Sequence, residues 1–486
     1  MLLEAVVAGS SMDTRDPSRL LSALSGLAHK HQVPGAQLAI HYGGATTAGE
    51  VGELESGTGR PITRDTAIPV GSITKCFTAT VAMALVADGD VDLDAPVRDY
   101  VPELGDMGAL ISLRQLLSHT SGLAESAGVE ETATATARHY IVEHVRRRGF
   151  VQSPGVSFSY SNPGYVVVGR LIETVTGMSW PEAVDAILLR PLGIEAAFVG
   201  LPGTEPGRRP VATGHSVNTA VGRIRPVRPE GGAANAPAGA LAVSALDLVK
   251  LGLIHVAPGK PGILPAAWAA QMRRPVSGAD PFGLADGWGL GLAVFRQQAA
   301  DWVGHDGNAD GTSCYLRINL TDGWVVALTS NSNTGIGLWQ DLQAELARAN
   351  HLVDFPGIQT PRGQRVVPPR DCAGLYVNGD VRYAVKADDA GAIHLSIDGA
   401  NFIPITLHED LSFTFSMPDL VSVGQVFTGR FVCDPITSEV YGVHVSGRLA
   451  CRHSFPGMAL STAQPLTRRR VSPERSSCHG DPGRDA

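Results

Sequence analysis

Runs of apolar residues in the first two thirds of the chain fall into two classes, and each class predicts a different element. Two longer runs, Phe77 to Asp88 and Val166 to Val175, are typical of buried helices. Shorter runs rich in β-branched or aromatic residues are typical of strands. These shorter runs are Thr66 to Val70, Tyr315 to Ile318 and Trp324 to Leu328, with Thr321-Asp322-Gly323 as a hairpin turn between the last two. The pattern predicts a domain that mixes helices with antiparallel strands.

Beyond residue 345 the pattern changes to short alternating runs separated by turns. A segment rich in Pro, Gly and Arg, residues 351–369, predicts a linker. Several short strands at regular spacing are typical of a small β-barrel or sandwich. The predicted strands are Val381 to Val385, Ile393 to Ile397, Phe402 to Leu407, Phe413 to Ser416, Gly424 to Val432 and Val440 to Val445. We therefore expect a catalytic domain over 1–350, the linker, an all-β domain over 370–465 and a disordered tail over 466–486.

Composition and charge limit the kinds of binding partner that we expect. The chain has 486 residues, a net charge of −8 and a pI near 6.0, which gives no reason to expect nucleic acid or an anionic membrane as partner. No run reaches the roughly 20 apolar residues of a membrane span. Residues 1–11 contain Glu4 and no early basic residue, unlike a secretory signal. We expect a cytoplasmic protein that binds neither nucleic acid nor membrane.

The six cysteines show no C-x-x-C spacing, and no histidine lies at zinc-ligand spacing from another ligand. Reduced, mostly buried thiols are the favoured interpretation, and disulfides are the alternative. We expect no metal and no cofactor.

The chemistry centres on Ser72-Ile73-Thr74-Lys75, at the junction of a predicted strand and a predicted helix. Residues three apart on a helix lie on one face, so the Lys75 amine is expected beside the Ser72 hydroxyl. The helix N-terminus offers unsatisfied N–H groups to the serine oxygen. A desolvated lysine has a lowered pKa and can act as a base. A helix-capping serine is the alternative.

Two further motifs follow in order: Tyr160-Ser161-Asn162, and His305-Asp306-Gly307 followed by Asn308. The order Ser-x-x-Lys, Tyr-x-Asn, His-x-Gly resembles the penicillin-recognising serine hydrolases, and most of all their class C β-lactamase-like branch. Other segments are also similar to this family over roughly residues 20 to 345. They are Leu93 to Val97, Leu116 to Leu123, Pro237 to Leu241, Ser244 to Leu248 and Trp288 to Leu292.

The resemblance implies an α/β (α+β) serine β-lactamase/transpeptidase-like fold, a central antiparallel sheet flanked by helices. The segment Cys372-Ala373-Gly374-Leu375-Tyr376 resembles the start of the lipocalin-like C-terminal domain of many class C-type hydrolases. We therefore expect the second domain to be a small lipocalin-like barrel.

Site roles follow from the motifs and the resemblance. Ser72 is the expected nucleophile, and Lys75 and Tyr160 share its proton, with the formal base left open. Asn162 is expected to bond Lys75 or a substrate amide, and His305 to support the Tyr160 oxygen. The resemblance places the oxyanion hole at the backbone N–H groups of Ser72 and Asn308, and Gly307 is expected to allow close approach of the substrate.

Stand-alone penicillin-binding-protein-type thioesterases of nonribosomal peptide pathways resemble this chain most. The resemblance implies a peptidyl thioester substrate, a carrier protein as its bearer, and macrocyclisation by amine attack on the acyl-enzyme. Arg448 is a candidate for a terminal carboxylate or phosphopantetheine, and Glu230 for an ammonium; a solvated surface charge is the alternative for both. Two other functions remain open: a D-stereospecific amidase, peptidase or esterase that uses water, and a catalytically silent binding protein.

Overall fold

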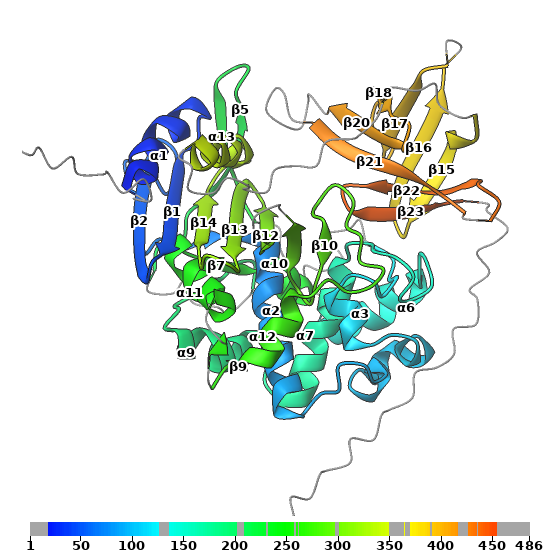
Figure 1. Ribbon diagram of the computed structural model, residues 1–486, viewed down its shortest axis with the longest axis horizontal. Coiled ribbons are helices and arrows are strands. Elements are labelled where there is room, and N and C mark those ends of the chain that lie inside the picture. Colours follow the sequence, from blue (N-terminus) through cyan, green and yellow to red (C-terminus); the bar gives the residue numbers. More distant parts are fainter. Residues whose placement is uncertain are drawn as a thin grey trace, which may run out of the picture.

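The computed structural model describes residues 18–125, 136–201, 209–229, 232–256, 259–260, 262–296, 301–348, 364, 370–388, 391–416, 426–434 and 436–453. Its centre is a seven-stranded antiparallel sheet (Figure 1). In sheet order the strands are β10 (Gly287–Trp288), β11 (Ala293–Arg296), β12 (Asp301–Ala309), β13 (Thr312–Asn319), β14 (Val325–Ser330), β1 (Gly35–Tyr42) and β2 (Ala45–Gly52).

Successive side chains of the central strands point to opposite faces of the sheet, and each face packs in its own hydrophobic layer. Leu38 and Ile40 of β1 pack with helices α1 (Ser18–Lys30) and α13 (Gly335–Arg348). Ala39, between them, points to the opposite layer, which contains α2 (Thr74–Asp88), α7 (Asn162–Thr176) and α11 (Ala245–Val256). A central antiparallel sheet with helices on both faces is confirmed.

The helical region completes the layer around α2. Its further α-helices are α3 (Leu113–Leu117), α5 (Ala137–Tyr140), α6 (Arg146–Arg148), α8 (Trp180–Val184), α9 (Arg190–Leu192), α10 (Ala236–Gly239) and α12 (Ala266–Arg273). Two π-helical turns are η4 (Ile141–Val145) and η5 (Asp185–Leu189). The 3₁₀ turns are η1 (Gly71–Ile73), η2 (Val97–Asp99), η3 (Pro102–Ala109), η6 (Ala233–Asn235) and η7 (Arg370–Cys372). Short strands pair locally: β3 (Ile68–Pro69), β7 (Leu241–Val243) and β4 (Ala197–Phe198); β5 (Gly214–Asn218) and β6 (Arg223–Val227); β8 (Gly259–Lys260) and β9 (Leu264–Pro265).

The C-terminal part forms a second, nine-stranded antiparallel sheet that curls into a nearly closed barrel. Its strands are β15 (Gly374–Asn378), β16 (Val381–Ala387), β17 (Ile393–Ile397), β18 (Ile403–Pro404), β19 (Thr406–Leu407), β20 (Ser412–Ser416), β21 (Val426–Cys433), β22 (Val440–Val445) and β23 (Arg448–Arg452). Tyr376, Phe413 and Phe431 are buried in its core. The predicted strand Phe402 to Leu407 is two short strands, and β23 has no counterpart in the prediction.

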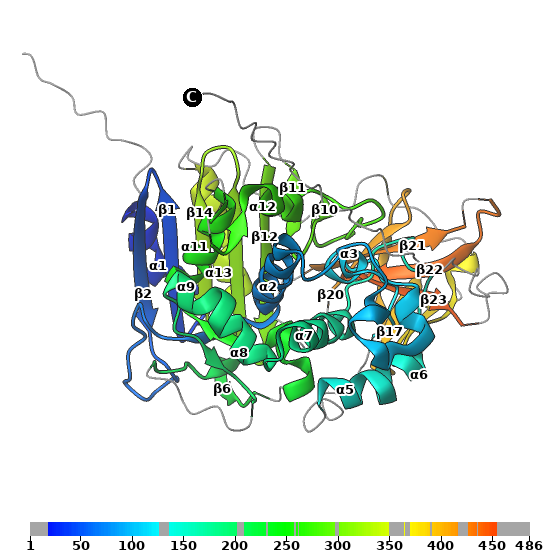
Figure 2. The ribbon, with the colours of Figure 1, turned by 90° about the horizontal axis from the view of Figure 1, so that it is seen from below.

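Figures 1 and 2 both show the barrel beside α3 and α6, at the side of the molecule away from α1 and β2. Contacts across this junction include an ion pair between Arg148 of α6 and Asp380. The predicted linker and tail lie outside the described residues, apart from Gln364, so the proposed domain boundaries stay predictions.

Candidate active site

Ser72 lies in the 3₁₀ turn η1, which joins β3 to α2. The sequence predicts that Ser72 begins the α-helix, but α2 begins two residues later, at Thr74. Gly71 adopts a positive φ of 51°, and a Cβ there would overlap the backbone of Asn308. The sharp turn therefore holds the Ser72 backbone against strand β12.

Lys75 lies behind Ser72 and has no exposed surface. Its Nζ is 3.1 Å from Ser72 Oγ and 2.7 Å from the carbonyl oxygen of Ala238 in α10. The pKa of Lys75 is lowered to about 7, mainly by burial; the Glu125 carboxylate opposes the lowering and the Arg448 charge adds to it. Near neutral pH a large share of Lys75 is thus uncharged, with a lone pair available to the serine proton.

Tyr160 covers the same pair from the other side. Lys75 Nζ is 5.0 Å from the centre of its ring. Its Oη is buried and has no partner of normal hydrogen-bond geometry among the described residues. Burial raises the pKa of Tyr160, although the neighbouring Ser72 hydroxyl and the Arg448 charge oppose the rise. Tyr160 is therefore a neutral phenol at physiological pH, able to donate a proton.

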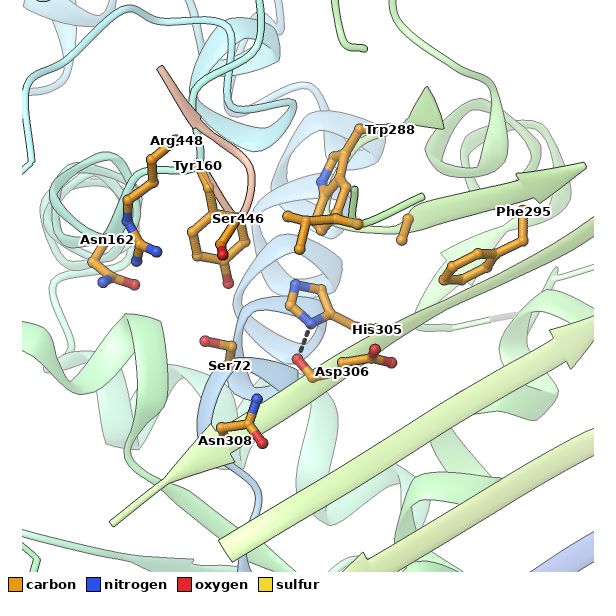
Figure 3. Close-up of a pocket in the computed structure, with 12 residues that line it drawn as sticks. Ser72, Tyr160, Asn162, Trp288, Phe295, His305, Asp306, Asn308, Ser446 and Arg448 are labelled. Carbon is orange, nitrogen blue, oxygen red and sulfur yellow. Dashed lines mark hydrogen bonds between the residues drawn. The ribbon is translucent and has the colours of Figure 1, made fainter. Parts of the chain in front are cut away.

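Asn162 begins helix α7, with Ser161 as its N-cap. The Ser161 backbone N–H donates to His119 Nδ1 at 3.1 Å, and the His119 ring lies 4.3 Å from the Tyr160 ring. No hydrogen bond joins Asn162 to Lys75 in the described structure, where Lys75 bonds Ser72 and Ala238. The alternative, a bond from Asn162 to a substrate amide, stays a prediction. Asn162 lines the cavity in front of Ser72 (Figure 3).

His305 also departs from expectation. Its Nδ1 is 2.6 Å from the backbone oxygen of Asp306, so Nδ1 carries the proton and Nε2 is the acceptor. Nε2 is buried and has no hydrogen-bond partner, Tyr160 included, among the residues that the structure describes; the His305 and Tyr160 ring centres are 6.2 Å apart. Burial and the Lys75 charge lower the pKa of His305 to about 4. His305 is thus a neutral hydrogen-bond acceptor on the cavity wall.

Gly307 does not line the cavity, and its expected part in the approach of the substrate stays a prediction. It is buried, and a Cβ at this position would overlap the carbonyl oxygen of Val70. Its missing side chain lets β12 pack against the segment before Ser72, which places Asn308 beside Ser72. The backbone N–H groups of these two residues remain the predicted oxyanion hole.

Arg448 reaches the site from the C-terminal barrel. Ser446 and Gly447, with φ of 48° and 78°, form the tight turn between β22 and β23. The Arg448 guanidinium lies 5.4 Å from the Tyr160 ring centre, and its Nε is 3.3 Å from Glu125 Oε2. The surface-charge alternative for Arg448 is therefore wrong. Glu230 lies outside the described residues, so its role stays a prediction.

Three residues at the site were not predicted as site residues from the sequence. Glu125 is 4% exposed and pairs with Arg448, from a position 323 residues earlier. Asn378 of β15 accepts a hydrogen bond from the Glu125 backbone at 2.8 Å. Trp288, which the sequence placed only in a segment similar to the family, has its ring centre 5.2 Å from that of His305 and forms a cavity wall. These contacts join segments that are far apart in the sequence, so no local pattern predicts them.

The cavity in front of Ser72 has a volume of about 390 Å³. Figure 3 shows Asn162 and Arg448 on one side of Ser72 and Asp306 and Phe295 on the other. Of the predicted residues, Ser72, Tyr160, Asn162, His305, Asn308 and Arg448 line it, whereas Lys75 lies behind Ser72. Such a constellation can form and break an ester bond at the serine oxygen.

Other site types find no support in the described residues. No group of three or more His, Cys, Asp or Glu side chains there is placed to hold a metal ion. Within the same residues no helix has the length and apolar character needed to cross a membrane. The five described cysteines are unpaired thiols, and four of them are buried.

Comparison with known proteins places this geometry in context. A family model described as Beta-lactamase matches residues 20–350. The chain is 32% identical to penicillin-binding protein 4 of Amycolatopsis lactamdurans, over 71% of this chain and 94% of that protein. The crystal structure of SurE is 36% identical and superposes with a TM-score of 0.80, covering 91% of this chain and all of SurE; SurE has also been solved with D-Leu. A D-amino acid amidase from Ochrobactrum anthropi, solved with L-phenylalanine amide, is 25% identical with a TM-score of 0.58 over 69% of this chain and 98% of the amidase.

Proposed function

The chain belongs to the β-lactamase and penicillin-binding-protein family of serine hydrolases, and on this premise we propose that it is a stand-alone thioesterase that releases a nonribosomal peptide as a macrocycle. Ser72 takes the peptidyl group from a thioester, which a carrier protein bears in the cell. The peptide's own amine then displaces Ser72. The reacting end of the peptide is a D-residue, and the product belongs to antibiotic-type peptide biosynthesis.

The observation that carries the proposal is that the C-terminal barrel contributes part of the wall of the Ser72 cavity. Ser446 and Arg448 of the β22–β23 turn line the same cavity as Ser72. The likeness to SurE covers 91% of the chain and therefore extends into this barrel. The D-Leu complex of SurE supports a D-configured residue at the reacting end. A wall that restricts the access of water to the acyl-enzyme favours transfer of the acyl group to an amine.

Acylation follows from the Ser72–Lys75 pair. One N–H of neutral Lys75 donates to the Ala238 carbonyl, which leaves the nitrogen lone pair free to accept the Ser72 proton. Ser72 Oγ then bonds to the thioester carbonyl carbon while the C–S bond breaks. The negative oxygen of the tetrahedral intermediate lies between the N–H groups of Ser72 and Asn308.

The thiol leaving group needs little acid catalysis from Tyr160. A thiol has an ordinary pKa near 8.5, so a thiolate departs with little help from an acid. The proton that Lys75 takes from Ser72 can pass through the Tyr160 hydroxyl to sulfur, which leaves both side chains neutral. In the second step the amine attacks the ester carbon, the C–N bond forms, the bond to Ser72 Oγ breaks, and the amine's surplus proton returns to Ser72 through Lys75 and Tyr160.

One alternative has its own support. The likeness to the D-amino acid amidase favours a hydrolase that cleaves D-configured amides with water. An amide leaving group needs full protonation, which Tyr160 would have to provide. Both reactions pass through a Ser72 ester, so they differ in the leaving group that forms it and in the acceptor that resolves it.

The test uses a peptidyl-N-acetylcysteamine thioester with a D-residue at its C-terminus. Products are separated and weighed by liquid chromatography and mass spectrometry, with Ser72→Ala as the control. A cyclic peptide that the variant does not produce supports the cyclase. Linear acid alone favours the hydrolase, and no turnover of thioesters, amides or esters favours a silent binding protein.

A further inference from the structure

A second chamber of about 250 Å³ opens from the Ser72 cavity. The two cavities share lining residues, among them Phe295, Asp306 and Ser446. Neither Ser72 nor Tyr160 lines the second chamber. It is therefore continuous with the reaction site and lies outside the space where the ester bond forms.

The chamber lies between helix α13 and barrel strand β21. Tyr315 and Trp339 form one wall as a stacked pair, with ring centres 4.8 Å apart and planes 4° from parallel. Val426 and Phe427 of β21 line the chamber from the barrel. Flat, apolar walls of this kind bind aromatic or large aliphatic side chains.

A carboxylate stands at the junction of the two cavities. Arg317, which is only 3% exposed, donates a hydrogen bond to Asp306 Oδ1 and lies 4.2 Å above the Phe295 ring. The Asp306 side chain is 44% exposed, and its second oxygen can accept a further hydrogen bond. His305 lines the Ser72 cavity beside Asp306, and its Nε2 is turned away from Asp306 (Figure 3). The second Asp306 oxygen is thus a hydrogen-bond acceptor at the junction of the chamber and the Ser72 cavity.

We propose that this second chamber is the acceptor subsite, which binds the residue carrying the attacking amine: the amine at Asp306 and a large apolar side chain against Tyr315 and Trp339. The inference rests on the proposed acyl transfer, since it requires an amine acceptor. A carboxylate at the junction suits an N–H donor and repels an anionic leaving group.

The position of the chamber supports this choice of occupant. Figure 3 places Asp306 and Phe295 on the side of Ser72 away from Asn162 and Arg448. A peptide that cyclises brings its two ends to Ser72 from different directions. The acyl chain can then lie along the Asn162 and Arg448 side while the amine end enters past Asp306.

The experiment measures the partition of the acyl-enzyme between amines and water. The donor is the D-terminal peptidyl-N-acetylcysteamine thioester, and the acceptors are glycinamide and L-phenylalaninamide. Gln340 is an exposed residue of α13 that lines the chamber, so Gln340→Trp fills it from the surface. Ala344, one turn further on α13, is exposed and does not line it, so Ala344→Trp is the matched control. Val426→Trp fills the chamber from the barrel as an independent variant.

We expect both filling variants to lower the aminolysis-to-hydrolysis ratio for phenylalaninamide by about tenfold. The ratio for glycinamide and the rate of acyl-enzyme formation should stay within about twofold, as should all values for Ala344→Trp. Unchanged acceptor selectivity overturns the subsite alone. Slower acylation with unchanged selectivity also overturns it, because the chamber then serves the donor. If the unmodified protein hydrolyses the donor and never transfers it, both the subsite and the proposed function fail.

Discussion

The backbone N–H of Tyr160 donates a hydrogen bond to the carbonyl oxygen of Gly447, 2.9 Å away. This bond joins the tyrosine beside Ser72 to the β22–β23 turn of the C-terminal barrel. Next to it, Ser159 Oγ accepts the Leu449 backbone N–H at 3.3 Å. The barrel therefore supports the Tyr-x-Asn segment directly, as well as contributing Arg448 to the cavity.

Asn378 is the side chain that ties this junction together, and Asn378→Ala should weaken it. Its amide donates to the Leu449 carbonyl at 2.8 Å and accepts the Glu125 backbone N–H at 2.8 Å. Removal leaves buried polar groups unpaired, so we expect a loss of about 1–3 kcal/mol in the free energy of unfolding, with slower acylation. Urea unfolding measures the first quantity. Asn401→Ala, at an exposed barrel position, is the control and should change neither.

The pH dependence of acylation should follow Lys75. A pKa of about 7 means that the neutral, base-competent form grows as pH rises, from about a tenth at pH 6 to about nine tenths at pH 8. The rate of acyl-enzyme formation should rise over this range and then level off. His305, with a pKa of about 4, titrates below it. Stopped-flow release of the thiol measures the profile, and a rate that falls from pH 6 to 8 contradicts the assignment.

Replacement of Lys75 itself should remove that profile. Lys75→Met keeps the length of the side chain and removes the base, so we expect acylation to slow by about a hundred- to ten-thousandfold. The remaining rate should not rise between pH 6 and 8. A variant that acylates at the original rate would show that another group takes the serine proton.

Two neighbouring charges should move the profile in opposite directions. The Glu125 carboxylate raises the pKa of Lys75, and the Arg448 guanidinium lowers it. Glu125→Gln should therefore shift the midpoint of the acylation profile to lower pH, and Arg448→Met should shift it to higher pH. Each substitution also removes the ion-pair partner of the other charge, which reinforces the same shift. Shifts of equal sign would contradict the electrostatic origin of the Lys75 pKa.

The sequence predicted the parts of this molecule that local patterns encode. The apolar runs placed α2, α7, β13, β14 and most barrel strands, and the three motifs identified the residues that meet around Ser72. The contacts of His305 and Gly307 could not be predicted from the sequence. His305 bonds the backbone of its own neighbour, and Gly307 makes room for Val70, a packing requirement that no pattern of side chains records. The Glu125–Arg448 pair was not predicted, because its two residues are 323 positions apart in the sequence and no local pattern relates them.

Gly307 gives a test of the packing between β12 and the Ser72 turn. In Gly307→Ala the new methyl group meets the Val70 carbonyl, so the strand must move away from η1. We expect a loss of about 1–3 kcal/mol in the free energy of unfolding and slower acylation, because the Asn308 and Ser72 N–H groups separate. The control is Gly26→Ala in α1, where nothing lies within 4 Å of the new methyl group. Helix propensity predicts a gain of up to about 1 kcal/mol there.

The central claim is that a Ser72 ester passes its peptidyl group to an amine and not to water. Its most direct measurement is a single turnover of the D-terminal peptidyl thioester in isotopically labelled water, followed by intact-mass and product analysis. The account predicts a peptidyl adduct that Ser72→Ala does not form, and its decay to an unlabelled cyclic peptide. Release of the linear acid carrying one labelled oxygen from the adduct would contradict it.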